Sequence, residues 1–511
     1  MSSPMLWPQQ EARRIAERWP DRQTYILETG FGPSGHPHMG TVGEVVRTYY
    51  VAMGLKELGK QAEIIVFSDD MDGLRKIPKN IDAPWLAEHL GKPVSRIPDP
   101  YGCCPSYSAH MNRELIEMLD KTGIPYRFVA SSDMYNGGHY DEVIKRIFRH
   151  GQQILDLMLP TMREENRVNW FFWQPACENC GRVNTTVVHE WDPETTRVRY
   201  SCTGEFRGVR GCGHAGEQDA LGGKGKLGWK IDWAARWFYF PVHYEMYGKD
   251  LIDSAKISTE IVRILGGQPP VQMFYEMFLT EEGRKISKSV GEGITLENFH
   301  RWGTQDAVNL LMFKNPRQQK NLGPETVIRY MDEVLTLDPA DPQYRFVYYH
   351  GERPDLGGLR YSDLINLMSA IGITDPNLLR PYLERTFGNA RIGESWPYVR
   401  ELLEKARNYY EDFILPTRRV PDLTPEQWAL VDEFLALIDR ETEPDRIQSG
   451  IFEIARAHGI PAREYFKLLY GVLLGADSGP RIGGFVHLLG REKVKEIVEA
   501  ARQKQQEKQQ I

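Results

Sequence analysis

The sequence predicts an α/β protein with a doubly wound parallel sheet, followed by an all-α C-terminal region. In the first half, short apolar strands alternate with helical patterns, which is typical of parallel sheets because each parallel connection needs a crossover. After about residue 325 the strand patterns end. Apolar residues then recur at helical spacing, as in SWPYVRELLEKARNYYEDFI at 395–414 and PAREYFKLLYGVLLG at 461–475.

The composition is that of a folded protein with several domains. The chain has 511 residues, of which 41% are hydrophobic and 26% charged, so disorder as the main state is excluded. A net charge of −7 argues against a sequence-blind DNA-binding protein. We find no apolar run long enough for a membrane span and no secretory signal. We therefore expect a cytoplasmic protein without DNA or membrane partners.

The first predicted unit is a strand, a turn and a helix. The β-branched and aromatic run RQTYILETGF at 22–31 is followed by the turn-rich GPSGHPHMG at 32–40 and by a helical pattern over 41–58. Ligands of parallel α/β sheets bind at the carboxyl ends of strands. The glycine-rich turn could therefore bind an anion through backbone N–H groups at a helix N-terminus, although a plain turn with solvated histidines would have the same pattern.

Three further strands are predicted, at 62–68, 125–130 and 236–242. The first of these ends in an acidic cluster within SDDMD at 68–72. Carboxylates at this position could hold Mg²⁺ or an amino group of a substrate. Helix capping and salt bridges within a loop are the alternative use of the same side chains.

A second loop with possible phosphate chemistry is TEEGRKISKSVGEG at 280–293. Lys285 and Lys288 could fold over a triphosphate and offset the charge that develops on departing pyrophosphate. By itself the pattern is weak, because paired lysines in polar loops are usually solvated surface residues.

The six cysteines fall into two groups that suit metal binding in a reducing compartment. The first group has the spacing of a zinc ribbon and consists of Cys177, Cys180, Cys202 and Cys212, with His214 as an alternative to one thiolate. Four thiolates leave no open position for water, so we expect structural zinc. The second group consists of Asp99, Cys103, Cys104 and His110. Adjacent cysteines are strained on one metal, so buried thiols are an equally good interpretation of this spacing.

The turn and the lysine loop together resemble the paired HIGH and KMSKS motifs of class I aminoacyl-tRNA synthetases. Thr41 replaces the usual second histidine and Ile286 the usual methionine. The segments ETGFGPSGHPHMGTVGEV, FSDDMDGLRKIP, PDPYGCCPSYSAH, WKIDWAARW and GKDLIDS follow in an order that resembles the class I lysyl-tRNA synthetase family. This resemblance extends over nearly the whole chain.

The resemblance implies roles for individual residues. The ATP-binding residues would be Pro33, Ser34, Gly35, His36, Pro37, His38, Met39, Gly40, Thr41, Lys285, Ile286, Ser287, Lys288 and Ser289. Among these, His38, Lys285 and Lys288 would be catalytic. A second zinc would be bound by the Asp99 group, which gives two structural zinc ions.

Lysine recognition is also implied by the family. Gly30, Trp229 and Tyr275 would bind the substrate, with the two aromatic rings enclosing its side chain. Both rings could instead be ordinary core residues. Many members have a histidine directly after Gly-Lys-Asp, where this chain has Leu251.

The implied reaction is the activation of L-lysine by ATP and Mg²⁺, followed by transfer to tRNA(Lys). The expected parts are a Rossmann-type catalytic domain at 1–164 with a metal-binding insert near 98–112, a zinc ribbon at 165–228, the second Rossmann half with the KMSKS loop and stem-contact region at 229–325, and a helical anticodon-binding domain at 326–511. Two other classes remain open. A nucleotidylyltransferase that does not act on tRNA would share both loops, and a zinc-dependent nucleic-acid-binding protein would need only the metal clusters.

Overall fold

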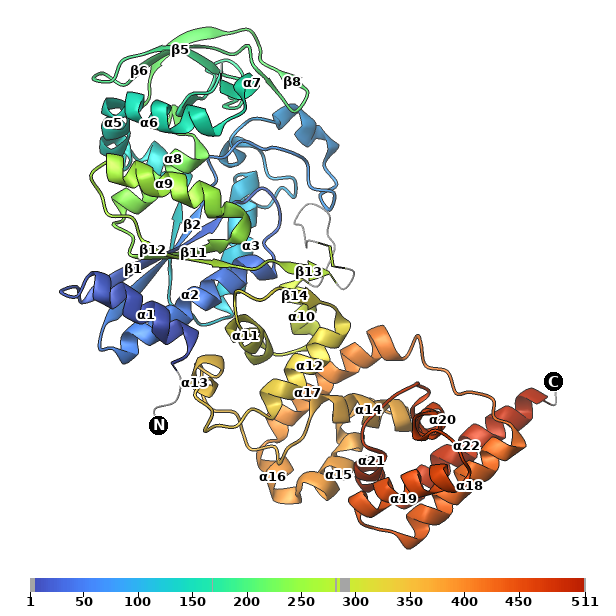
Figure 1. The fold of residues 1–511 in the computed structure, drawn as a ribbon. Coiled ribbons are helices and arrows are strands. Elements are labelled where there is room, and N and C mark those ends of the chain that lie inside the picture. Colours follow the sequence, from blue (N-terminus) through green and yellow to red (C-terminus); the bar gives the residue numbers. More distant parts are fainter. Residues whose placement is uncertain (1–4, 168, 281–282, 285–294, 510–511) are drawn as a thin grey trace. The chain divides into compact units, whose positions relative to one another are not determined.

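The computed structural model describes residues 5–167, 169–280, 283–284 and 295–509. These residues form two compact units (Figure 1). Unit 1 comprises Met1–Thr295 and Met312–Gly323, and unit 2 comprises Leu296–Leu311 and Pro324–Ile511. Within the described ranges, no helix combines the length and apolar character that a membrane crossing requires.

Unit 1 is built on a parallel sheet of five strands in the order β12-β11-β1-β2-β3. The strands are β1 Thr24–Phe31, β2 Gln61–Ser68, β3 Arg127–Ala130, β11 Tyr244–Gly248 and β12 Val271–Tyr275. The strands predicted at 22–31, 62–68 and 125–130 are thus confirmed. From the centre of the sheet, β1, β2 and β3 follow one another toward one edge, and β11 and β12 follow one another toward the other edge. The carboxyl ends of β1 and β11 therefore form the switch point at which doubly wound sheets bind ligands.

The strand predicted at 236–242 is wrong. Residues up to 239 belong to helix α8 (Trp229–Tyr239), and β11 begins only at Tyr244. Trp233 and Trp237 are four residues apart, so they lie on one helical face, where both are buried. A short aromatic run has the same composition in a buried helix and in a strand, and only the longer pattern from Trp229 favours the helix.

Helices cover both faces of the sheet, with α1 and α2 on one side and α8 and α9 on the other (Figure 1). Apolar side chains of β2 and α8 belong to one buried cluster, in which Phe67 and Trp237 have no exposed surface. The helices of unit 1 outside the insertion are α1 Trp7–Arg18, α2 Met39–Glu57, α3 Tyr107–Asp120, α4 Ser131–Asn136, α5 Asp141–Arg149, α6 Gly151–Met158, α7 Glu164–Arg167, α8 Trp229–Tyr239 and α9 Ile252–Ile264.

Between α7 and α8 the chain forms short antiparallel strands. β4 Trp173–Pro175 pairs with β10 Gly225–Leu227, and a three-stranded sheet joins β5 Val187–Trp191, β6 Arg197–Ser201 and β9 Ala215–Asp219. A small hairpin pairs β7 Glu205–Phe206 with β8 Val209–Arg210. After β12, β13 Phe278–Thr280 pairs with β14 Lys320–Leu322 in a separate parallel pair.

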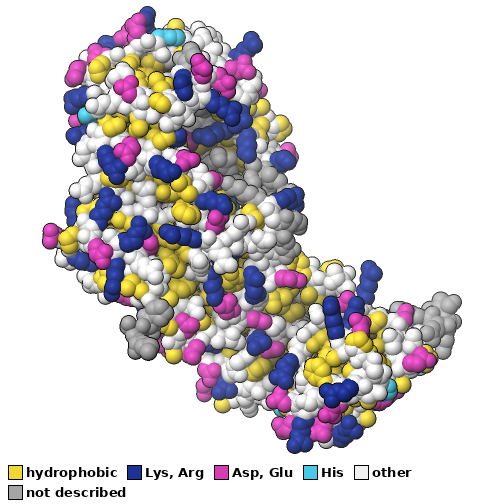
Figure 2. Space-filling view, viewed as in Figure 1, with side chains coloured by type: hydrophobic (Ala, Val, Ile, Leu, Met, Phe, Trp, Pro, Cys, Tyr) yellow, Lys and Arg dark blue, Asp and Glu magenta, His cyan; other side chains and the backbone are white. Residues whose placement is uncertain are grey.

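Unit 2 is mostly helical, as its apolar spacing predicts. Its helix α18 begins with a capping box, because the Thr424 hydroxyl accepts the Gln427 N–H at 3.3 Å and the Gln427 side chain accepts the Thr424 N–H at 3.0 Å. The longer helices are α12 Pro324–Leu335, α14 Tyr361–Ile371, α15 Pro376–Phe387, α17 Trp396–Tyr409, α18 Pro425–Arg440, α19 Pro444–Ala457, α20 Ala462–Leu474, α21 Ile482–Leu489 and α22 Arg491–Gln509. On the face shown in Figure 2, basic and acidic side chains are interspersed.

Candidate active site

The glycine-rich turn after β1 ends at the N-terminus of α2. His38 is the N-cap residue, and its Nδ1 accepts hydrogen bonds from the backbone N–H groups of Gly40 at 3.0 Å and Thr41 at 3.3 Å. A Cβ atom on Gly40 would lie 2.8 Å from His38 Cε1, so a larger residue would displace the imidazole. His38, Met39, Gly40 and Thr41 line a cavity of about 210 Å³. The cavity lies at a helix N-terminus, and acidic side chains, namely Glu44, Asp250 and Glu276, also line it.

A second cavity, of about 500 Å³, lies at the carboxyl ends of β1, β2 and β11. Pro33 and Ser34 line it, whereas Gly35, His36 and Pro37 line neither cavity. The other predicted ATP-binding residues, namely Lys285, Ile286, Ser287, Lys288 and Ser289, lie outside the described residues. The structure therefore brings together one half of the predicted ATP site.

The residues predicted to bind lysine surround these two cavities. Gly30 lines both, Trp229 lines the larger and Tyr275 the smaller. Trp229 is partly buried and its ring centroid lies 5.0 Å from that of Trp233. Leu251 also lines both cavities, so this apolar side chain faces the predicted substrate site.

Glu44 is a site residue that the sequence analysis missed. Its Oε1 accepts the Gly30 N–H at 3.0 Å, and its Oε2 accepts the Tyr275 hydroxyl. The side chain lines both cavities although the residue is only 8% exposed. The sequence did contain a signal for this residue, because Glu44 stands among the apolar residues Val42, Val45 and Val46 of the helical pattern. An acid on a buried helical face requires polar partners.

At the larger cavity, Arg236 faces three carboxylates, of which Glu28 and Asp232 are buried and Asp69 is partly buried. Arg236 Nη1 lies 3.1 Å from Asp69 Oδ1, and its Nε lies 3.5 Å from Glu28 and 3.8 Å from Asp232. Its guanidinium also stacks 4.5 Å from the ring centroid of Phe67. Burial raises the pKa of Glu28 to about 8 and that of Asp69 to about 7, against the attraction of Arg236. Burial therefore favours the neutral forms of these two acids, and the Arg236 guanidinium opposes this effect.

The contacts of the acidic cluster after β2 are capping bonds and salt bridges, and Asp69 pairs with Arg236 as described above. Asp70 caps α4, because it accepts the Ser132 N–H at 2.6 Å and the Ser131 hydroxyl at 3.0 Å. Asp72 pairs with Lys226. Burial opposes ionisation of Asp72, but the Lys226 ammonium outweighs this effect and lowers the pKa of the carboxyl. Asp69 and Asp72 line the larger cavity, and Asp70 does not.

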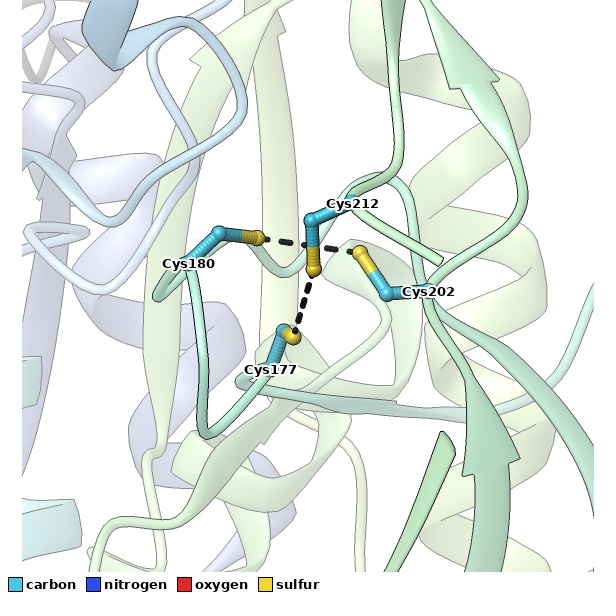
Figure 3. Close-up of side chains that lie close together, drawn as sticks. All are labelled: Cys177, Cys180, Cys202 and Cys212. Atoms are coloured by element: carbon cyan, nitrogen blue, oxygen red, sulfur yellow. Dashed lines mark hydrogen bonds between the residues drawn. The ribbon is translucent and has the colours of Figure 1, made fainter. Parts of the chain in front are cut away.

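The four cysteines of the insertion converge on one point (Figure 3). The Cys177 and Cys212 sulfurs are 3.6 Å apart and the Cys180 and Cys202 sulfurs 3.7 Å apart. All four sulfurs lie within 4.8 Å of one another. A tetrahedral zinc with bonds of about 2.3 Å separates its sulfurs by about 3.8 Å, so this cluster fits structural zinc. The fifth candidate, His214, lies outside this group, with its Nε2 3.7 Å from Glu178.

The second predicted group also converges. It consists of Asp99, Cys103, Cys104 and His110. Each of these residues offers one possible ligand atom, and the four atoms lie within 4.8 Å of one another. Asp99 Oδ2 accepts the backbone N–H groups of both cysteines at 2.8 Å. These bonds fold the adjacent cysteines around the carboxylate, which removes the geometric objection raised by their sequence spacing.

The chain was also compared with known proteins. Residues 5–343 match the family model described as tRNA synthetases class I (K). A lysine–tRNA ligase of Rickettsia bellii (strain OSU 85-389) is 36% identical, with 96% of this chain and 97% of the relative covered. The lysine–tRNA ligase of Rickettsia prowazekii (strain Madrid E) is 36% identical, with 96% of each chain covered.

Among solved structures, a glutamate tRNA ligase from Elizabethkingia meningosepticum covers 93% of this chain and 99% of its own at 13% identity. Its TM-score of 0.35 is too low to support an argument about this chain. The family match spans well over half of the sequence, and the Rickettsia relatives align along nearly all of it. The chain therefore belongs to the class I lysyl-tRNA synthetase family.

Proposed function

We propose that this protein activates L-lysine with ATP and transfers it to tRNA(Lys). The observation that carries the proposal is the pair of adjoining cavities at the switch point of the sheet. The smaller cavity lies at the N-terminus of α2, where a phosphate group could approach backbone N–H groups. Carboxylates line both cavities, with Glu44 shared between them, and they suit a substrate with two ammonium groups. Family membership supports the same assignment.

In the first step, a lysine carboxylate oxygen forms a bond to the α-phosphorus of ATP, and the bond between that phosphorus and the bridging oxygen breaks. Pyrophosphate leaves, with Mg²⁺ offsetting its charge when bound. In the second step, a ribose hydroxyl of the terminal adenosine attacks the lysyl carbonyl and AMP leaves. Because no enzyme nucleophile is needed, the chain contributes positioning and electrostatic stabilisation.

On the ATP side, we assign phosphate binding to the N-terminus of α2. The His38 imidazole fixes the first turn by accepting the N–H groups of Gly40 and Thr41. By resemblance, Lys285 and Lys288 supply the cationic groups that stabilise departing pyrophosphate. The helical unit 2 would read the anticodon, where unstacked bases are held by aromatic and basic side chains.

On the lysine side, we assign Glu44 to one of the ammonium groups. Its oxygens accept hydrogen bonds from the Gly30 N–H and the Tyr275 hydroxyl, and the carboxylate lines both cavities. Trp229 provides an aromatic face in the larger cavity, where a cation gains about 0.5–2 kcal/mol. Leu251 adds no polar contact, which increases the share of recognition carried by Glu44.

Exchange of labelled pyrophosphate into ATP tests this proposal. We expect exchange with lysine and with no other standard amino acid, and we expect labelled lysine to be transferred to tRNA(Lys). Exchange without any amino acid would indicate a nucleotidylyltransferase, and no exchange at all would favour a zinc-dependent nucleic-acid-binding protein. Glutamate, glutamine or cysteine as the better substrate would contradict the lysine assignment.

We also propose that both metal groups hold zinc, at about two ions per chain. Cys180→Ser should remove one ion and open the insertion, because so small a β-structure depends on zinc for folding free energy. Amide exchange in β5, β6 and β9 should become at least about tenfold faster. Mass spectrometry of metal content and of deuterium uptake measures both effects. Cys104→Ser is the matched control, which should lose the other ion and leave exchange in these strands unchanged.

A further inference from the structure

One carboxylate joins the second metal group to the ATP loop. Glu114 lies on α3, four residues after the metal-group residue His110. Its Oε1 is 3.2 Å from His110 Nε2, and its Oε2 is 2.6 Å from His36 Nδ1. His36 belongs to the glycine-rich turn but lines neither cavity. Its position is therefore suited to holding the turn and not to touching a ligand directly.

The orientation of His110 fits a metal ligand. Its Nδ1 faces the metal group, 3.3 Å from Cys103 Sγ and 3.3 Å from Asp99 Oδ1. A histidine that binds a metal through one ring nitrogen usually donates the N–H of the other to a carboxylate, which fixes the ring. Glu114 accepts that second N–H, so a metal ion on Nδ1 would fix the position of the glutamate.

A second contact links the same two histidines. The Tyr101 ring stacks on His110 with centroids 4.3 Å apart, and its hydroxyl lies 2.9 Å from His36 Nε2. The Tyr101 backbone N–H donates to Asp99 Oδ1 at 3.1 Å. Both ring nitrogens of His36 are thus held by residues that also contact the metal group.

We propose that Glu114 is a positioning residue, which transmits occupancy of the Asp99, Cys103, Cys104 and His110 metal site to His36 and so to the ATP loop. Metal at this site then raises the affinity for ATP without contacting the nucleotide. The inference rests on the proposed function for its two ends, the metal group and the ATP-binding turn. The Glu114 side chain is 26% exposed, and its two carboxylate oxygens contact one histidine each.

The test is a double-mutant cycle on the full chain, with zinc content determined for each purified protein and ATP dissociation constants then measured by calorimetry without added zinc. Cys104→Ser removes the metal, and Glu114→Ala removes the connection. Each should weaken ATP binding about tenfold, the scale of losing one hydrogen bond to a charged group, here the bond that holds His36. The double variant should also lose about tenfold and not a hundredfold, because both changes break one pathway. Lysine affinity should not change.

Asp120→Ala is the matched control at the far end of the same helix, where Asp120 accepts the Tyr126 hydroxyl at 2.8 Å, and it should bind ATP as the wild type does. If Glu114→Ala misfolds, Glu114→Gln keeps the shape and should shift ATP affinity in the same direction. Wild-type ATP affinity in Cys104→Ser, or losses that multiply in the double variant, would overturn the inference.

Deuterium uptake without ATP gives a readout that is independent of activity. Amides of residues 34–41 should exchange faster in both single variants than in the wild type and in Asp120→Ala. Unchanged uptake in both would contradict a positioning role for Glu114. Failure of the proposed function is distinguishable, because the wild type itself would then show no lysine-dependent pyrophosphate exchange.

Discussion

Arg236→Gln should lower the free energy of unfolding by roughly 3–5 kcal/mol, the usual cost of removing one partner from a buried charge cluster. Arg236 is 2% exposed and lies within 4 Å of three carboxylates. Among these, Glu28 has no exposed surface. Without the guanidinium, these acids must either lose their charge or remain charged and unpaired. Chemical denaturation followed by circular dichroism measures the difference.

The destabilisation should depend on pH. A carboxylate whose pKa is higher in the folded than in the unfolded state makes the folded state lose stability as pH rises between the two values. In the wild type this loss ends near the folded pKa values, about 8 for Glu28 and about 7 for Asp69. Without Arg236 those values rise further and the loss continues. The gap between variant and wild type should therefore widen from about pH 6 to about pH 9.

Arg127→Gln is the matched control. Arg127 makes the same two kinds of contact, an ion pair with Glu63 at 2.6 Å and a stacking contact 5.4 Å from the Phe240 centroid. Its side chain is 48% exposed, so its removal should cost less than about 1 kcal/mol at any pH. Equal costs for Arg127 and Arg236, or a gap that narrows with rising pH, would contradict the buried-network interpretation.

Glu44→Gln should raise the KM for lysine by about 100-fold or more, because leaving a desolvated charge without its partner costs roughly 2–5 kcal/mol. The substitution keeps the size of the side chain and removes the negative charge between the two cavities. The KM for ATP should change little. Pyrophosphate exchange at varied lysine and at varied ATP separates the two constants.

Two further variants define what Glu44 does. Tyr275→Phe removes only the hydroxyl that holds Glu44, so its lysine KM should rise less, by about tenfold. Glu57→Gln, at the far end of the same helix, should behave as the wild type. A normal lysine KM in Glu44→Gln would remove this carboxylate from the substrate site. Equal increases for lysine and ATP would instead indicate a general disturbance of α2.

Local patterns in the sequence were sufficient for much of this protein. The spacing of apolar residues predicted the strands β1, β2 and β3, the helix after the glycine-rich turn and the helical unit 2. This was possible because helices and strands repeat their side-chain directions every few residues. The four cysteines of the insertion were also predictable, because a structural zinc needs a fixed set of thiolates from short, nearby loops.

Tertiary structure decided the contacts between distant segments. Glu44 meets Tyr275, Arg236 meets Glu28, and Glu114 joins His36 to His110 only because the parallel sheet brings their elements together. Helix α8 was mistaken in part for a strand because its aromatic residues are buried by neighbours that the sequence does not identify. A buried charge or aromatic ring is specified by partners far along the chain, so its role becomes visible only when the fold has placed them.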